Sequence, residues 1–365
     1  FLSGDVMLGR GIDQILPHPG DPAIFEPGAE SAHDYVHLAA RRSGPVPAPV
    51  GFDYVWGDGL AELERRKPDL RLINLETAVT KSGSPEPKGI NYRMNPDNIA
   101  VLRAARIDAC MLANNHVLDW GRDGLLETLR TLEKAGIGIA GAGRTARDAA
   151  APLILETAPE QRVIAFSFGS PTAGVPDHWA AGENRPGLSP LPGDPDLAVS
   201  RCRNLLQDIR KPGDIVIASI HWGSNWGYDI PSSQRILAHR LIDDVQVDIV
   251  HGHSSHHAKA FEVYKGKLVL YGCGDFLNDY EGIDGYEQYR GDLTLMYLVT
   301  MRPASGRLVR LEMVPFCIRQ FRLNRAAADD VRWLATTMDR ECGRFGSHVE
   351  LSNNNRLTLV SGPAV

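Results

Sequence analysis

The stretch that decides the fold is Val247-Asp-Ile-Val-His251-Gly-His253-Ser-Ser-His256-His257. Its apolar start, ending at Ile249 and Val250, predicts a buried β-strand that stops in four histidines within seven residues. Because alternate side chains of a strand lie on one side, His251 and His253 can face the same pocket. Neutral imidazole is the commonest protein ligand for first-row metals. A histidine-rich surface turn is the alternative, and ligand-type residues at other strand ends favour the metal site.

Composition limits the class of protein. The chain has 365 residues, of which 43% are hydrophobic, which is enough for a large core. A formal net charge of -6 argues against a nucleic-acid partner. No run of eighteen apolar residues is present, so we expect no membrane span in this chain. The cysteines show no CxxC spacing and are typical of reduced core thiols, which predicts a reducing compartment such as the cytoplasm; they are Cys110, Cys202, Cys273, Cys317 and Cys342.

The order of predicted elements indicates a layered α/β fold. Strand and helix patterns alternate over the first 140 residues, which is typical of strands gathered in one sheet. The second half is richer in strands. We expect a single α/β domain over residues 1–325, followed by a C-terminal helix and a loose tail over 326–365. Two segments rich in Pro and Gly, at about 17–50 and 169–195, are predicted to be irregular loop insertions that wall the substrate pocket.

Potential metal ligands follow several separate apolar runs. Carboxylates come first along the chain, then an Asn-Asn-His sequence, then the histidines; the residues are Asp5, Glu76, Asn115, His116, His221, His251 and His253. The carboxyl ends of parallel strands meet at one edge of a sheet, where ligands bind. A mixture of carboxylate, amide oxygen and imidazole suits two divalent ions such as Mn, Zn or Fe. One carboxylate can bridge a pair of ions that activates water or polarises an oxygen.

The order of these motifs resembles the calcineurin-like metallophosphatases and, within them, the bacterial capsule-synthesis branch, the CapA/PgsA family. The matching residues are Gly4-Asp5-Val-Met-Leu-Gly-Arg10, Asn74-Leu-Glu76, Ala113-Asn-Asn-His116-Val-Leu-Asp119, His221-Trp-Gly223, Gly252-His253, Glu262-Val-Tyr-Lys-Gly-Lys267 and Tyr271-Gly-Cys-Gly-Asp-Phe276. The resemblance covers roughly residues 1–320. It implies a sandwich of two sheets flanked by helices, with the metal site at the carboxyl ends of strands.

The resemblance also implies a role for each ligand. Asp5, Glu76 and one of His253 or His251 would hold the first ion, and Glu76 would bridge. Asn115, His221 and the other histidine would hold the second, while His116 would act as an acid/base group. The chain departs from ordinary metallophosphatases at Met7, where those enzymes have a histidine, and at Glu76, where they have an aspartate. These departures argue against simple phosphoesterase activity.

Further residues near the predicted site are candidates for catalysis or substrate binding. His256 and Asp279 are candidate acid/base groups, with a turn role as the alternative for Asp279. The candidate substrate-binding residues are aromatic or cationic, and each has core packing or a solvated loop charge as its alternative; they are Lys88, Arg93, Trp222 and Trp226.

Three enzyme functions compete. The chain resembles soluble lasso-peptide epimerases of the same branch, which invert the Cα centre of a C-terminal Trp, and this metal-supported reaction on a precursor peptide is our favoured hypothesis. Phosphoester hydrolysis is one alternative. Capsule or poly-γ-glutamate biosynthesis is the other. A binding module with a vestigial metal site is the non-enzymatic alternative.

Overall fold

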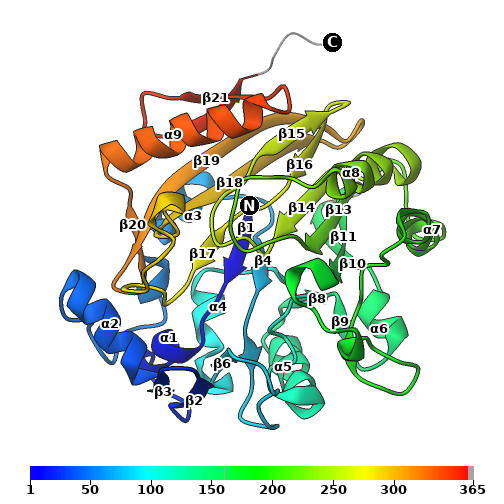
Figure 1. The fold of residues 1–365 in the computed structure, drawn as a ribbon. Helices are drawn as coiled ribbons and strands as arrows, with labels where there is room; N and C mark the ends of the chain where they lie inside the picture. The colour runs from blue at the N-terminus through cyan, green and yellow to red at the C-terminus, as the bar shows by residue number, and fades with distance from the viewer. Residues whose placement is uncertain (160, 361–365) are drawn as a thin grey trace.

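Two large β-sheets lie face to face with helices on their outer sides (Figure 1). The computed structural model describes residues 1–159 and 161–360. Side chains from both sheets meet in a central apolar core, for example Leu2 and Leu295 from one sheet and Ile217 and Phe261 from the other. Apolar side chains on the inner face of each sheet are thereby removed from water, which is the main stabilising contribution to such a fold.

The first sheet is mixed, and its centre is parallel. Strands β1, β4, β7 and β8 run parallel to one another, β17 pairs parallel with β1, and β18 pairs antiparallel with β1. The strands of this sheet are β1 (Leu2–Val6), β4 (Leu72–Leu75), β7 (Ala109–Met111), β8 (Gly138–Ala140), β17 (Asp275–Leu277), β18 (Leu293–Arg302), β19 (Arg307–Arg319), β20 (Arg322–Arg325), β21 (His348–Leu351) and β22 (Leu357–Val360).

Five helices pack on the outer side of the first sheet through a second apolar cluster. They are α1 (Arg10–Ile15), α2 (His33–Ser43), α3 (Gly57–Arg66), α4 (Ala100–Ala104) and α5 (Gly121–Lys134). In α5, Leu125, Leu129 and Leu132 are buried at helical spacing, so one stripe of the helix faces the sheet. Before α4, Asn95 caps a short 3₁₀ turn by accepting a hydrogen bond from the Asp97 backbone N–H at 3.0 Å.

The second sheet has six strands; the four inner ones run parallel to one another, and the two edge strands are antiparallel to their neighbours. The strands of this sheet are β10 (Leu153–Ala158), β11 (Gln161–Gly169), β13 (Ile215–His221), β14 (Ile249–His253), β15 (Phe261–Tyr264) and β16 (Lys267–Leu270). A third apolar cluster joins this sheet to α7 (Pro195–Leu206) and α8 (Ser232–Val245). The central strands are buried on both faces, which explains why β13 is an almost unbroken apolar run.

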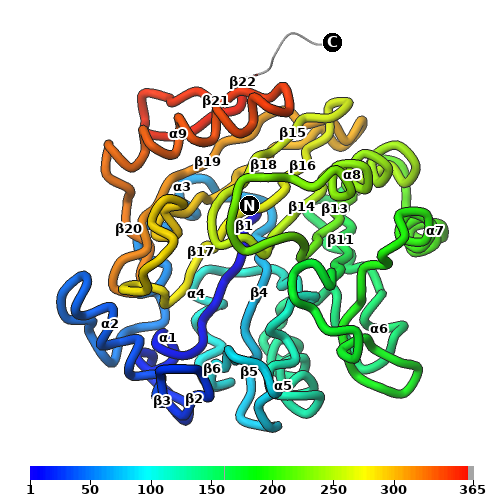
Figure 2. Tube along the Cα trace, viewed as in Figure 1, coloured from blue at the N-terminus to red at the C-terminus, as the bar shows by residue number. Residues whose placement is uncertain are grey.

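Two predictions from composition are wrong. Residues 17–50 are not an irregular loop, because they form the hairpin β2 (Ala23–Glu26) and β3 (Ala29–Ser31) and then α2. Tyr35 and Ala39, one helical turn apart, bury the inner stripe of α2. The tail as far as residue 360 is not loose either, since α9 (Ala328–Gly343) is followed by β21 and β22, which join the first sheet beside β19 (Figure 2).

The segment 169–195 is mostly without long elements, as predicted. Within it lie two 3₁₀ turns and β12 (Gly187–Leu188), which pairs with β9 (Ala142–Gly143); α6 (Ala146–Ala150) follows β9. Four of the five cysteines are buried, and none forms a disulfide among the described residues. No helix in the described part of the chain is both long and apolar enough to span a bilayer.

Candidate metal centre

The carboxyl ends of strands from both sheets meet at one place. Asp5 lies near the end of β1, and its register partner Asn74 lies two residues before Glu76. In the other sheet, His221 ends β13 and His253 ends β14, and the two are direct register partners. The face-to-face packing of the sheets brings these two sets of side chains together, as the strand-end pattern predicts.

Asp5 is common to two groups of potential ligands. One group contains Asp5, His221 and His253, and the other contains Asp5, Glu76 and Asp275, with ligand atoms in each group within 4.8 Å of one another. The Nδ1 atoms of His221 and His253 are 2.8 Å apart, and both are about 4 Å from Asp5 Oδ1. All five side chains are buried.

The three carboxylates of this centre lie together, and within the described chain no lysine or arginine forms an ion pair with them. Burial, and then the neighbouring Asp275, raise the pKa of Asp5 to about 8. Burial, with Asp5 and Asp275 adding to it, raises the pKa of Glu76 well above its usual range. A hydrogen bond from Asn74 Nδ2 at 2.7 Å and one from the Ser254 N–H at 3.1 Å hold Asp5 in place. Buried like charges of this kind need a counter-charge or protons.

The donor set fits divalent metal ions. The carboxylate oxygens and imidazole nitrogens lie close enough together for one ion to contact several of them. Such a mixture of ligands is typical of sites for Mn, Zn or Fe. Burial and the neighbouring histidines lower the pKa of His221 and His253, which keeps both imidazoles neutral and able to donate a lone pair. The acidic and histidine residues of this centre can therefore form a metal site.

The segment after β7 places further polar side chains next to His221 and Glu76. Asn115 Oδ1 lies 2.9 Å from His221 Nε2, on the side where His221 faces Glu76. His116 lies 3.9 Å from Glu76 through its Nε2. Its Nδ1 lies 2.6 Å from Asp119 Oδ2, and Lys88 Nζ donates to Asp119 Oδ1 at 2.6 Å. Burial, and then Lys88, lower the pKa of His116 well below its usual range, so His116 is neutral at pH 7.

A second histidine lies on the Asp275 side of the centre. His256 Nδ1 is 3.0 Å from Asp275 Oδ1, and its Nε2 is 3.0 Å from Asn225 Nδ2. Burial by itself lowers the pKa of His256, but the charge and hydrogen bond of Asp275 outweigh it, so the net shift is upward. Trp226 packs against His256 and stacks on Tyr286 with ring centroids 4.2 Å apart. This part of the centre therefore combines a protonatable imidazole with an aromatic wall.

Several predicted site residues lie elsewhere or act differently. His251 lies behind the centre, with Nε2 2.8 Å from the Ser3 carbonyl and Nδ1 3.1 Å from Ser219 Oγ. Trp222 is buried and donates to the Tyr271 carbonyl. Arg93 stacks on Trp120 at 3.7 Å. Neither group of potential ligands includes these residues.

Asp279 forms a buried ion pair with Arg10. Arg10 Nη2 lies 2.5 Å from Asp279 Oδ1, and Arg10 Nη1 lies 2.9 Å from Glu26 Oε2. The Arg10 guanidinium also lies over Tyr92, whose ring stacks on His116 at 3.8 Å. Arg10 and Tyr92 thus lie between Asp279 and His116, and Asp279 is in neither group of potential ligands.

Sequence reasoning missed Asp275 as a ligand and Asp119 as the partner of His116. Asp275 lies in β17 directly beside Asp5 in β1. A signal was present, because Gly274-Asp275 repeats the Gly4-Asp5 pair. Met7 is buried, and its sulfur accepts a hydrogen bond from the Gly9 N–H at 3.1 Å, so this position supports the loop rather than the centre.

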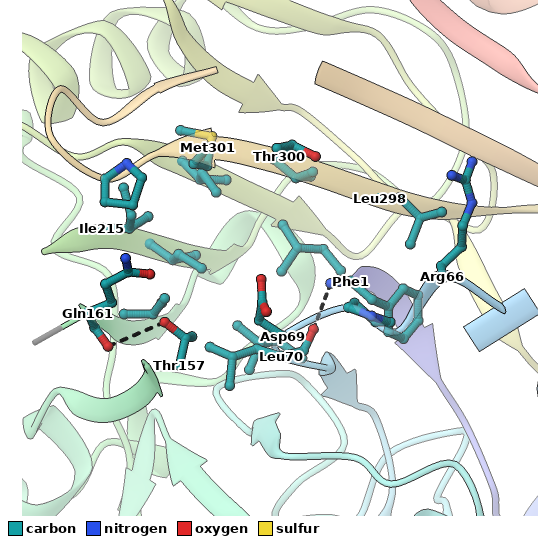
Figure 3. A pocket seen from close by; sticks show the side chains of 18 of the residues that line it. Phe1, Arg66, Asp69, Leu70, Thr157, Gln161, Ile215, Leu298, Thr300 and Met301 are labelled. Atoms are coloured by element: carbon teal, nitrogen blue, oxygen red, sulfur yellow. Dashed lines mark hydrogen bonds between the residues drawn. The ribbon is translucent and has the colours of Figure 1, made fainter. Parts of the chain in front are cut away.

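The described residues also line a cavity of ≈ 460 Å³ at the other ends of the strands (Figure 3). Figure 3 shows Phe1 and Arg66 on one side of it and Thr157 and Gln161 on the other. Its lining contains no histidine, and its only carboxylates in the described chain are Asp69 and Glu312. This cavity is therefore distinct from the metal centre.

These observations define an α/β protein with a buried carboxylate–imidazole centre shared by two sheets. The chain belongs to the bacterial capsule synthesis protein family PGA_cap, whose model matches residues 1–280. It is 46% identical over 363 residues to a probable polyglutamine synthesis accessory protein of Mycobacterium tuberculosis, covering 99% of this chain and 95% of that protein.

More distant relatives have related names. The PGA biosynthesis protein CapA of Bacillus subtilis is 28% identical over 319 residues, which is 87% of this chain and 70% of that protein. The capsule biosynthesis protein CapA of Bacillus anthracis is 24% identical over 282 residues, which is 76% of this chain and 59% of that protein. The predicted resemblance to the CapA branch is thus confirmed.

Proposed function

We propose that this chain is a metal-dependent enzyme that acts on a glutamate-based polymer, or on its peptide precursor, in capsule or polyglutamate synthesis. The observation that carries this proposal is the pair of ligand groups sharing Asp5, with the His116–Asp119 pair beside it. The names of the relatives support the biological role. Two divalent ions, when bound, would supply Lewis-acid stabilisation of negative charge on a substrate oxygen.

The chain's own residues supply the proton transfer. Asp119 accepts the Nδ1 proton of a neutral His116, which leaves the Nε2 lone pair directed toward the Glu76 side of the centre. Lys88 donates to Asp119 and orients this carboxyl group, and it opposes the effect of burial, which raises the pKa of Asp119 to about 7. His116 can then take a proton from a substrate or a water next to the ligands and return it to the leaving group.

A second candidate reaction is epimerisation at a peptide Cα, such as that of a C-terminal Trp. It is favoured by one observation, which is that the pKa values of His116 and His256 are shifted in opposite directions. A neutral imidazole and an imidazolium at one site are the base and acid that an epimerase requires. His116 would remove the Cα proton and His256 would donate a proton to the same carbon, and exchange with solvent would restore both.

Incubation of the metal-loaded protein in D₂O tests these proposals. Polyglutamate, a peptide ending in Trp and a generic phosphoester are offered separately. Polymer fragments support the hydrolytic form of the proposal, and deuterium at Cα without fragments supports epimerisation. Phosphate release with neither of these would instead assign the chain as a phosphoesterase. Absence of all three after reconstitution with Mn, Zn and Fe would contradict an enzymatic role.

A further inference from the structure

A cluster of arginines lies on the outer side of the first sheet, at the end opposite the metal ligands. We name as the arginine cluster the six arginines that pair with Asp58, Glu62 or Glu312; they are Arg65, Arg66, Arg310, Arg322, Arg325 and Arg356. They come from α3, β19, β20 and the turn before β22, and α3 packs against β20 (Figure 1).

The carboxylates of the cluster are shared and mostly hidden. Glu62 has no exposed side-chain surface and accepts from Arg325 Nη2 at 3.0 Å and Arg66 Nε at 3.3 Å, with Arg65 and Arg356 also in range. Glu312 is 8% exposed and pairs with Arg310 at 3.0 Å. Glu62 and Glu312 therefore hold the guanidinium groups in place and contribute little negative surface, whereas Asp58 is 40% exposed.

The guanidinium groups remain on the surface. The exposed side-chain fraction is 58% for Arg310, 51% for Arg325 and 46% for Arg65. Six cations share three carboxylates, and the Nε atoms of Arg322 and Arg356 have no acceptor among the described residues. Burial lowers the pKa of Arg356; the charge of Glu62 opposes this shift, and repulsion from Arg66 and Arg65 adds to it. This surface is positive although the chain carries a net charge of -6.

The cluster is also separate from the metal edge. Arg66 ends α3, just before the amino end of β4, whereas Glu76 follows the carboxyl end of the same strand. Glu312 pairs with Leu298, next to the amino end of β1. Arg66, which is labelled in Figure 3, and Glu312 both line the cavity at this end of the sandwich. A ligand on the cluster would therefore leave the metal centre free.

We propose that the arginine cluster is a docking surface for an acidic polypeptide, namely the glutamate-based polymer itself. The inference rests on the proposed function for the choice of polymer. Arginine presents a planar fork that binds carboxylates in two-point contacts, and a chain of regularly spaced carboxylates can engage several guanidinium groups at once. Each exposed contact is weak, so the affinity depends on their number and falls with salt.

Binding of fluorescent polyglutamate to the metal-free protein, followed by anisotropy at low and moderate salt, tests the docking surface. The variant combines Arg65→Gln, Arg310→Gln and Arg325→Gln, since each of these arginines is exposed and shares its carboxylate with another arginine. A control variant with the same loss of charge combines Arg144→Gln, Arg240→Gln and Arg344→Gln, which lie in exposed ion pairs elsewhere. Thermal unfolding verifies that both variants fold.

The cluster variant is expected to bind polyglutamate roughly tenfold more weakly, with a flatter salt dependence, while the control binds like the wild type. Equal weakening in both variants would show a general charge effect and overturn the proposal. So would unchanged binding in the cluster variant, or wild-type binding to anionic lipid vesicles but not to polyglutamate. Because no metal or turnover enters this assay, a wild type that binds polymer without processing it contradicts the proposed function and leaves the docking surface standing.

Discussion

Asp275 lies directly beside Asp5 across the parallel pair of β17 and β1, so two buried carboxylates that are far apart in the sequence share one centre. If both hold metal, Asp275→Asn should lower the number of divalent ions bound per chain, and Asp5→Asn, which alters both ligand groups, should lower it further. Elemental analysis after reconstitution measures this. Asp292→Asn, in an exposed pair with Arg290, is the control. Unchanged metal content in both ligand variants would contradict the assignment.

The metal-free protein should lose stability as pH rises. The pKa of Asp5 in the fold is about 8, above its ordinary value of 3.8, so its contribution is fully present below about pH 4 and is lost as pH rises through 8. Divalent ions should reverse this loss, because they replace the protons on the carboxylates. Thermal unfolding at pH 6 and pH 8, with and without Mn, Zn or Fe, measures both effects.

The stabilisation by metal should be greater at pH 8 than at pH 6, and at an ion concentration 100-fold above Kd it should reach about 2.7 kcal/mol. A metal-free protein that is equally stable at both pH values would contradict the shift at Asp5.

Replacing Glu76 by Gln should stabilise the metal-free protein and impair metal binding. The substitution removes one of three buried like charges while keeping the size of the side chain. We expect a gain of roughly 1–3 kcal/mol in the free energy of unfolding at pH 8, within the usual range for single substitutions. Denaturant unfolding measures the gain, and Glu133→Gln, at an exposed ion pair, serves as the control. A clear loss of stability would argue that Glu76 is not repelled by its neighbours.

Activity should fall on the alkaline side if His256 acts as the acid. Its pKa is raised by Asp275, and the imidazolium is present below that pKa and is lost as pH rises through it. In His256→Gln the alkaline decline should disappear together with most of the activity. The pH profile of kcat is the measurement. His348→Gln, at an exposed pair with Asp339, should leave the profile unchanged.

Removing the buried ion pairs of Arg10 should lower both the stability and the activity of the protein. Arg10 is buried and pairs with both Glu26 and Asp279. Arg10→Met leaves two buried carboxylates unpaired, and we expect a loss of about 3–5 kcal/mol, as for other broken buried pairs. Arg290→Met, at exposed pairs with Asp292 and Asp330, should cost less than about 1 kcal/mol. Chemical denaturation of both variants compares them.

The parts of the fold that sequence patterns predicted are those with strong local periodicity. Examples are α5, α8, β13 and β14. The pattern of apolar residues that become buried in each of them can be read from the few residues of that element alone. Residues 17–50 were predicted wrongly because their many prolines and glycines hide the short spacing that buries Tyr35 and Ala39. Composition describes the average of a segment, whereas one buried stripe is enough to fix a helix.

The candidate site was predictable as far as strand ends were concerned. Strand alternation correctly put His251 and His253 on one side of the strand. It does not show which of the two lies close enough to the other ligands, and His251 lies behind the centre, against Ser3 and Ser219. The sequence pattern did not identify Asp275 as a ligand, because β17 has only three residues and its position depends on pairing with β1, which is distant in the sequence. A local pattern does not report such pairing.

The metal centre draws Asp5, Glu76 and Asp275 from one sheet and His221 and His253 from the other. Ions held there would act as a clasp between the two halves of the sandwich. Any sliding of one sheet over the other would pull the imidazoles away from the carboxylates. Ion binding therefore favours the aligned arrangement of the sheets, and loss of alignment weakens ion binding. The rate of amide hydrogen exchange in β1 and β14 would then report whether ions hold the two sheets in alignment, because exchange should be slow when they do.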